Sequence, residues 1–556
     1  MRIALTLAVI GFVLLCGWLV AESGLFENPS QVGQSCILLQ RVSTGEEPET
    51  ITMPAPEKEQ PEAVDFADLG ATGGIETSVT LGSTDPKSGY KYELELSSKG
   101  AAIRKAIFSE FDDRDHKDPQ PLVILSPVLQ ANGSEILSMA NQGFQNGAFI
   151  QQKLEVPLQD LHWKSFGVEK AGDGSQTARF EATIIIKATR EPIIKLTKTY
   201  KVGRDSYLLD CDITVENLGS AEQKVRFNLA GPGGLGREAF RTDMRKVVAG
   251  FRDSEGQIVS ARLDRKKLAK AKSLNDRRLT RPGDDFLWIA AVNKYFAAIV
   301  VPLADEGKDY CDWVRDSTGR FHNPDGDAKA DSGDETVGLD LKLASNTLAA
   351  AGQAGSSKTY KFQLYLGPKD KSLFDKNELY QRLGFVHTID FMGCCCPAKI
   401  IKPLAFGILA LMKWMHGFIP NYGVVIIILV FLMRLAMHPV TKKSQVSMSK
   451  MGQLAPKAEE IKKKYANNKA EMNKQMMALY REQGASPIMG FLPMMVQMPI
   501  WIALWSAVYA SIDLRGAGFL PFWITDLSIP DALYRFPTVI VVPLLGWKIE
   551  SLNLLP

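Results

Sequence analysis

The sequence predicts a membrane protein that combines a large extracytoplasmic all-β domain with an α-helical membrane-embedded region. Three observations predict this class. Residues 74–370 read as short runs of alternating apolar and polar residues, separated by glycine, asparagine and proline, which is the pattern of half-buried strands. Residues 424–437 are an apolar run typical of a membrane span. Residues 442–484 are rich in lysine, so the positive-inside rule places them in the cytoplasm and the β domain outside it.

Composition sets limits on the class of function. The chain has 556 residues and a formal net charge of +3, which is long enough for two or more domains. Its seven cysteines are scattered and show no CxxC pair, and its six histidines lie far apart in the sequence. We therefore predict no disulfide framework, no metal site and no cofactor. The run Cys394, Cys395 and Cys396 fits either lipidation or packing, and the sequence does not choose between them.

The chain begins with an expected membrane anchor and a linker. Behind Arg2, residues 3–20 form an uncharged apolar run, which at about 1.5 Å per residue would span roughly 27 Å of bilayer. We expect residues 1–21 to be an uncleaved signal anchor rather than a cleaved signal peptide, because Leu19 is a poor residue at the −3 position. Residues 22–73 carry acids and prolines with few apolar residues to bury, so a flexible linker is expected.

The β region, residues 74–370, has enough strands for two large packed sheets. Within it, residues 262–281 are markedly basic. A nucleic-acid site would favour interleaved aromatic residues, and none is present here. We expect a solvated loop instead, one that could touch anionic lipid headgroups. The neighbouring acids Asp112 and Asp113, and Asp284 and Asp285, could serve a glycosidase, but solvated or capping groups are the expected reading.

The C-terminal third predicts a series of helices. In order, we expect an amphipathic interfacial helix at 400–418, a second membrane span at 419–441, a cytoplasmic helical hairpin at 442–484, a third span at 486–512, and a periplasmic loop with the start of a further span at 513–556. The hairpin is predicted because apolar residues recur at three- and four-residue spacing on both sides of Asn467 and Asn468, which interrupt the pattern.

Two polar residues stand out in the expected spans. Arg434 interrupts the apolar run, and an arginine inside hydrocarbon costs about 3 kcal/mol on insertion scales. A span with such a residue usually faces protein or a wet cavity, so we favour a functional charge over an arginine that reaches the lipid headgroups. Gln497 lies between Pro493 and Pro499 in the third span. A glutamine in lipid needs a partner, so its face is expected to point inward.

These features resemble the bacterial YidC membrane protein insertases. The similarity is most specific in NYGVVIIILVFLMRLAMHPVTKKSQVSMSKMGQLAPKAEEIKKKY (421–465), MMALYREQGASPIMGFLPMMVQMPIWIALW (476–505) and LRGAGFLPFWITDLS (514–528). The outer domain is similar through LELSSKGAAIRKAIF (94–108), LWIAAVNKYFAAIVVPL (287–303) and YLGPK (365–369). The resemblance covers most of the chain and is strongest after about residue 400.

The resemblance implies a fold and a site. The outer domain is expected to be a periplasmic supersandwich, similar to sugar-binding folds, in an inner-membrane protein. The helices are expected to enclose a hydrophilic groove open to the cytoplasm and to lipid, with Arg434 lining it and Gln497, Met498 and Pro499 near the path of the substrate. The family has three more spans after the third, and this sequence ends where the fourth should begin, so we expect a C-terminally truncated, incomplete insertase core.

The implied activity is insertion of newly made membrane proteins without chemical catalysis. The expected partners are nascent membrane proteins, the ribosome, the Sec translocon and the lipid bilayer, with no small-molecule substrate. The basic hairpin would receive the ribosome or the incoming chain, because acidic and RNA surfaces attract it. Its candidate contact residues are Lys442, Lys443, Lys457, Lys462, Lys463 and Lys464. No Walker-type nucleotide loop is present in the sequence.

Two other classes of function compete with this hypothesis. A membrane-anchored carbohydrate-binding or carbohydrate-active protein would use the β domain, and it would need convergent acids or aromatic residues in a cleft. That reading leaves Arg434 and the charged hairpin unexplained. An ion channel or transporter would need several ionisable groups inside the membrane, and one arginine is too few.

Overall fold

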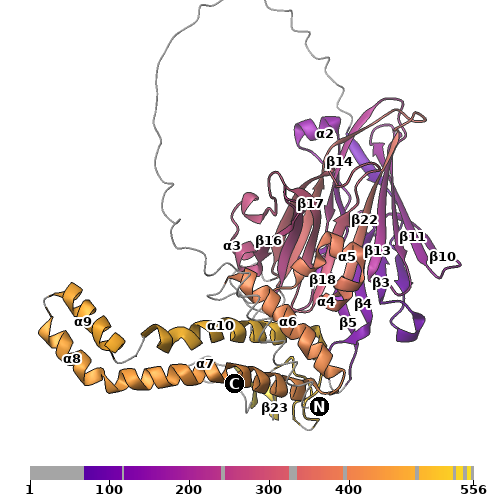
Figure 1. Cartoon of the computed structure of the whole chain (residues 1–556). Helices are drawn as coiled ribbons and strands as arrows, with labels where there is room; N and C mark the ends of the chain where they lie inside the picture. The colour runs from indigo at the N-terminus through magenta and orange to yellow at the C-terminus, as the bar shows by residue number, and fades with distance from the viewer. Residues whose placement is uncertain are drawn as a thin grey trace, which may run out of the picture. The chain divides into compact units, whose positions relative to one another are not determined.

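A computed structural model describes residues 68–115, 118–238, 244–324, 335–391, 397–466, 468–482, 487–521, 523–529, 534–541 and 548–552 (Figure 1). These residues form two compact units. One contains the described residues up to 428 together with those from 499 onward, and the other contains the described residues from 429 to 498. The expected signal anchor, the linker up to residue 67, and Cys394, Cys395 and Cys396 lie outside the described residues.

The largest sheet of the β domain has ten strands, which pair in antiparallel fashion. Its order is β1 (Leu69–Thr72), β11 (Gln176–Ile186), β12 (Pro192–Val202), β13 (Leu208–Asn217), β22 (Ser357–Pro368), β18 (Phe296–Pro302), β17 (Asp285–Val292), β15 (Lys246–Arg252) and β16 (Ile258–Asp264), with β10 (Lys164–Lys170) also paired to β11. In the central strands one face is buried and the other half-buried. Along β12, Ile194, Leu196, Lys198 and Tyr200 alternate with less buried residues, as strand geometry requires.

Two smaller sheets complete the domain. The six-stranded sheet contains β19 (Val314–His322), β20 (Thr336–Leu343), β14 (Gln223–Ala230), β8 (Asn141–Asn146) and β9 (Val156–Pro157), with β21 (Asn346–Leu348) paired to β14. The four-stranded sheet contains β2 (Ser78–Gly82), β3 (Tyr92–Ser97), β4 (Ala102–Asp112) and β5 (Pro121–Leu125). Short connecting elements are β6 (Val128–Leu129), β7 (Glu135–Ile136), η1 (Pro86–Ser88), α2 (Gly147–Gln152), α3 (Arg265–Lys270) and η2 (Asn275–Arg277).

Aromatic side chains fill the core between the ten-stranded and six-stranded sheets. Phe227 of β14 packs edge-to-face on Tyr360 of β22, with ring centroids 5.2 Å apart. Trp313, directly before β19, contacts Tyr360 and Phe362 of the opposite sheet at 5.2 and 5.1 Å. Such edge-to-face pairs add to the stabilisation that comes from burying apolar area. The predicted all-β fold of two large packed sheets is confirmed.

Strands β17 and β18 are buried on both faces, over residues 287–292 and 296–302. The helices α4 (Lys371–Lys376), α5 (Glu378–Leu383) and η3 (Phe385–Thr388) cover the sheet face that does not meet the sandwich core. The indole Nε1 of Trp288 donates a hydrogen bond to the Leu383 carbonyl oxygen at 2.6 Å, and its ring packs on Phe385. Because both faces are covered, these two strands read as continuous apolar runs rather than alternating ones.

Five helices form the C-terminal region of the described chain: α6 (Ala398–His416), α7 (Tyr422–Gln453), α8 (Ala455–Lys464), α9 (Lys469–Glu482) and α10 (Pro487–Ala510). Helix α6 buries a stripe at three- and four-residue spacing, made of Ile401, Ala405, Ile408, Met412 and Met415. Helix α7 runs through Pro439 without a break and includes Tyr422–Pro439, the one stretch among the described residues long and apolar enough to cross a membrane. The turn η4 (Ile512–Leu514) follows α10.

Two segments differ from the sequence-based expectation. Residues 262–281 are not a solvated loop, because they contain the end of β16, helix α3 and η2, and their arginines form ion pairs. Near the C-terminus, the expected start of a further span instead contains the antiparallel strands β23 (Tyr534–Val541) and β24 (Lys548–Leu552). The β-branched run from Thr538 to Val541 favours a strand over a helix.

Candidate functional site

Arg434 lies on α7, inside the apolar stretch Tyr422–Pro439. Its side chain is exposed in the structure, and it takes part in at least one polar or electrostatic interaction. The apolar residues Phe431 and Leu435, on either side of it, are 64% and 52% exposed. These three residues lie on the same face of α7, because positions three and four apart are neighbours on a helix, so the charge of Arg434 is set among exposed apolar side chains.

Three further candidate residues, Gln497, Met498 and Pro499, are consecutive on α10. Gln497 and Pro499 are half-buried, and Met498 is 39% exposed. Arg434, Gln497 and Met498 belong to one compact unit, whereas Pro499 begins the part of α10 that belongs to the other. Whether these side chains line one groove with Arg434 therefore stays a prediction.

The lysines predicted to contact partners lie along the end of α7 and on α8. Lys442 and Lys457 are exposed, as are Lys462, Lys463 and Lys464. The last three occupy the final turn of α8, where the helix dipole favours positive charge. Lys443 is also on α7, but its side chain is not among those described. The exposed ammonium groups are available to an acidic surface.

Sequence reasoning missed a buried ion cluster in the β-domain unit. The Glu238 carboxylate accepts from Arg515, with Nε 3.0 Å from Oε2, and from Arg114, with Nη2 2.9 Å from Oε2. Arg114 also faces Asp526, with Nη1 and Oδ2 3.9 Å apart. Each of these four side chains is at most 9% exposed. The cluster joins the end of β4 to the segment that follows α10.

A second cluster connects α6 to other parts of the same unit. The Lys413 ammonium lies 2.7 Å from Asp370 Oδ1 and 3.4 Å from Asp513 Oδ2. Asp370 also caps α4, since its carboxylate accepts from the Ser372 backbone N–H. Burial raises the pKa of Asp513, and Lys413 opposes that shift while Asp370 adds to it. Burial would also raise the pKa of Asp370, but Lys413 and Ser372 lower it below its usual value.

Sequence signals for these clusters are weak. Arg515 and Asp526 lie in the 514–528 segment that was noted for its resemblance, but nothing in that segment points to residues of the β domain. Glu238 follows a glycine-rich stretch at 231–236 that reads as an ordinary loop. The partners come from distant parts of the chain, so spacing could not have found them.

Comparisons with known proteins match both parts of the chain. Residues 89–405 match the family model described as the YidC periplasmic domain, and residues 414–549 match the one described as the 60Kd inner membrane protein. The chain is 26% identical to a membrane protein insertase YidC from Chlorobaculum tepidum, over 99% of this chain and 83% of that relative. It is 27% identical to a membrane protein insertase YidC from Geobacter sp. strain M21, over 81% of this chain and 72% of that relative.

Two solved structures were also found to be similar. The crystal structure of an active YidC insertase with its first transmembrane domain resolved is 14% identical, covers 78% of this chain and 73% of that chain, and gives a TM-score of 0.22. A galactose mutarotase-like protein from Lactobacillus casei is 12% identical, covers 52% of this chain and 100% of that chain, and gives a TM-score of 0.26.

Proposed function

Because the chain belongs to the YidC family of membrane protein insertases, we propose that it inserts membrane proteins through a polar groove in which Arg434 is the central charge. Membership makes it an inner-membrane protein with a periplasmic domain, and its substrates are nascent membrane proteins. The observation that carries the groove proposal is the position of Arg434 within the apolar stretch Tyr422–Pro439 of α7.

The proposed role of Arg434 follows from electrostatics. A hydrophilic tail must cross the bilayer before its apolar segment can enter lipid, and a polar groove shortens that distance. Coulomb attraction between Arg434 and an acidic residue on the tail is stronger than in water because the surrounding dielectric constant is lower. The apolar segment then leaves water for lipid, which is favourable by roughly 25 cal/mol per Å² of apolar area. No bond is made or broken in this process.

Residues on α10 would supply the path beside Arg434. Gln497 offers an amide that can donate to and accept from a passing backbone, and its half-buried position keeps it partly available. Met498 is flexible and polarisable, so it can adapt to many apolar segments. Pro499 leaves one backbone carbonyl of α10 without its usual helical partner, which adds a hydrogen-bond acceptor near the path.

The hairpin of α8 and α9 is the proposed receiving surface on the cytoplasmic side. The exposed lysines of α8 would attract the ribosome, an incoming acidic tail or the Sec translocon. This attraction weakens with salt, because exposed charges are screened over about 10 Å at 0.1 M ionic strength. We further propose a multi-pass arrangement, in which residues 1–21, α7 and α10 cross the membrane.

Reconstitution tests the proposed function. The purified chain would be placed in lipid vesicles and supplied with a single-span client made by a purified translation system. Insertion is measured as protection of the translocated tail from added protease. We expect protection that rises with the amount of the chain and stays at background in empty vesicles. Equal protection in both kinds of vesicle would contradict the proposal.

A further inference from the structure

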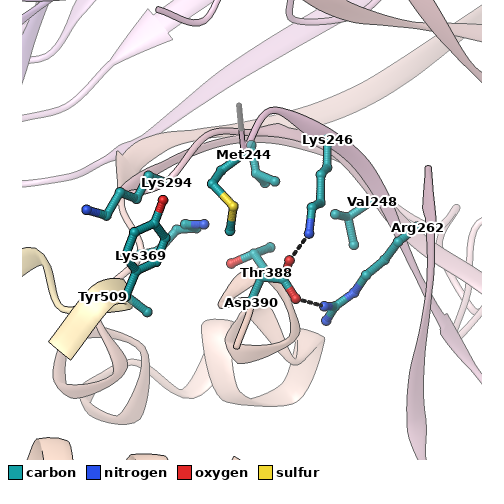
Figure 2. A pocket seen from close by; sticks show the side chains of 11 residues that line it. Met244, Lys246, Val248, Arg262, Lys294, Lys369, Thr388, Asp390 and Tyr509 are labelled. Carbon is teal, nitrogen blue, oxygen red and sulfur yellow. Dashed lines mark hydrogen bonds and ion pairs between the residues drawn. The ribbon is translucent and has the colours of Figure 1, made fainter. Parts of the chain in front are cut away.

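A small pocket lies at the base of the β domain, where four parts of the chain meet (Figure 2). Its walls come from β15 and β16, from the turn after β17, from the segments after β22 and η3, and from the end of α10. The central cavity has a volume of about 10 Å³. That is room for one water-sized group, such as a single oxygen atom of a larger anion.

The lining carries an excess of positive charge. Of the eleven lining residues, four are cations, namely Lys246, Arg262, Lys294 and Lys369, and one is an acid, Asp390. Asp390 is already used, because it pairs with Lys246 and with Arg262, whose Nη1 lies 2.7 Å from Oδ1. Within the described part of the chain, neither Lys294 nor Lys369 forms an ion pair with a carboxylate.

Both lysines are deeply buried, at 7% exposure for Lys294 and 6% for Lys369. Lys369 Nζ donates one hydrogen bond, to the Asn293 carbonyl oxygen at 2.6 Å. Lys294 Nζ lies over two aromatic rings, 4.6 Å from the centroid of Tyr295 and 4.1 Å from that of Tyr509. An ammonium group has three N–H donors, so Lys369 keeps unused donors beside the cavity.

Burying such cations is unfavourable unless an anion offsets their charge. Burial lowers the pKa of Lys369 to about 7, Asp390 opposes that shift, and Lys246 and Arg262 add to it. Burial also lowers the pKa of Lys294 to about 8; Arg114 adds to that shift, and Glu238 and Asp526 oppose it. The excess of cations in the lining and the unused Lys369 donors together describe a site that suits one negative group.

The surroundings indicate where that group would come from. Tyr509 and Ala510 of the pocket are the last residues of α10, so the pocket lies at the end of a proposed membrane span. Phe391, next to Asp390, packs edge-to-face on Phe406 of α6, with ring centroids 4.8 Å apart, so α6 lies beside the same cluster. In the multi-pass arrangement proposed above, on which this inference rests, the end of α10 would lie at the level of the outer-leaflet headgroups, where each phospholipid presents a phosphate.

We propose that this pocket binds a phosphate group, taking one of its oxygens beside the Lys369 ammonium, while Lys294, over the Tyr509 ring, adds positive charge nearby (Figure 2). The position of the pocket favours a lipid headgroup as the source of the phosphate. The rest of the headgroup would lie at the mouth of the pocket, because the cavity holds a single water-sized group. The bound lipid would fix the base of the β domain at the membrane surface, independently of the proposed groove.

Binding by the full-length chain tests the proposal. The protein would be purified in a maltoside detergent, depleted of lipid, and kept in phosphate-free buffer. The probes are phosphatidylglycerol, inorganic phosphate, and diacylglycerol, which has the same tails without a phosphate. Bound lipid is counted by native mass spectrometry, and the thermal unfolding midpoint is followed as each probe is added. We expect saturable binding and stabilisation with phosphatidylglycerol but not with diacylglycerol.

The variants Lys369→Met and Lys294→Met leave the Asp390 ion pairs in place. Lys369→Met should bind about tenfold more weakly, because a charge-assisted contact is lost. Lys294→Met should also bind more weakly than the unchanged chain, because a nearby positive charge is removed. The matched control is Lys224→Met, which removes an exposed lysine of β14. If inorganic phosphate stabilises the chain in a saturable way, phosphatidylglycerol does not, and the same variants remove the effect, the site would be assigned to free phosphate instead of lipid. The site is ruled out if neither phosphate-bearing probe binds, or if both variants bind them like the unchanged chain. Since the readout is binding, failure here leaves the insertase proposal untouched.

Discussion

Arg515 and Glu238 lie 277 positions apart in the sequence and form a buried ion pair, with Nε 3.0 Å from Oε2. Arg515 also donates from Nη2 to the Asp112 carbonyl oxygen at 2.6 Å, and its guanidinium lies over the Phe296 ring. These contacts attach the segment after α10 to two strands of the β domain. We call these contacts the Glu238 joint. Because its charges are buried, it is stable only if each charged group keeps its partner at hydrogen-bonding distance, whereas an apolar contact has no such requirement.

Removing the acid at the centre of this joint should destabilise the protein strongly. Glu238→Gln leaves Arg114 and Arg515 buried side by side without their shared carboxylate. Breaking a buried pair by removing one partner typically costs about 3–5 kcal/mol. We expect a lower thermal unfolding midpoint for the full-length chain and faster proteolysis of the segment at 511–529.

The control for this prediction is an ion pair of the same type at the surface. Arg281 pairs with Asp284 at 2.5 Å and is 44% exposed, so Arg281→Met should cost about 0–1 kcal/mol. In addition, the losses caused by Glu238→Gln and Arg515→Met should not add, because the two residues contact each other. Strictly additive losses would show that the pair is not energetically coupled.

Lys413 should be the residue that holds α6 near Asp370 and Asp513. Lys413→Met leaves two carboxylates without that ammonium group, at a cost near the low end of about 1.5–3 kcal/mol because the site is partly exposed. The folded-state pKa of Asp513, already raised by burial, should rise further. A carboxyl with a raised folded pKa binds its proton more tightly when folded, so the variant should regain stability as pH falls from 7 to 5.

This pH dependence is measurable as the unfolding midpoint of the variant relative to the unchanged chain. Lys413→Met combined with Asp513→Asn should restore stability at pH 7, since one of the two facing charges is removed. A loss in Lys413→Met that is equal at pH 5 and pH 7, and that Asp513→Asn does not repair, would contradict the electrostatic account.

Lys369 should make the stability of the protein rise with pH. Its pKa falls from 10.5 to about 7 on folding. Below pH 7 both states carry the charge, and the full cost of burying it is present. Between the two values the unfolded state alone keeps the proton, so stability rises by up to about 1.4 kcal/mol per pH unit. Lys369→Met should have a smaller slope between pH 7 and 9 in anion-free buffer, with the part due to Lys294 remaining, while the exposed-site control Lys224→Met keeps the full slope. An unchanged slope in Lys369→Met would contradict the assignment.

Replacing either of two glycines of α7 by alanine should change the stability of the protein, in opposite directions at the two positions. A Cβ at Gly423 would lie 2.2 Å from the Phe519 ring, so Gly423→Ala forces a shift that costs about 1–3 kcal/mol. Near Gly452 nothing lies within 4 Å of such a Cβ, and Gly452→Ala should stabilise the helix by about 0.5 kcal/mol. Thermal unfolding of both variants checks this prediction. A stabilising Gly423→Ala would show that α7 does not begin against Phe519.

The sequence predicted those features whose evidence lies within a single helix or strand. Alternation predicted the β domain, because each strand shows one face to the core, as Tyr92, Leu94 and Leu96 do. The same logic failed for the base of the domain. Arg262 reads as part of a basic loop, yet it pairs with Asp390, 128 positions later. Ion pairs between distant elements leave no periodic trace, so neither the Glu238 joint nor the cationic pocket could be predicted.

The groove proposal is tested most directly by changing the charge at position 434 and, separately, the charge on the tail of a client protein. Single-span clients with an acidic, a neutral or a basic tail would be followed by protease protection in vesicles that contain the unchanged chain, Arg434→Ala or Arg434→Glu. The account predicts that Arg434→Ala inserts the acidic-tailed client about tenfold less, the equivalent of about 1.4 kcal/mol, and the neutral one nearly normally. It also predicts that Arg434→Glu prefers the basic tail. Equal insertion of the acidic-tailed client by stable Arg434→Ala and the unchanged chain would contradict the account.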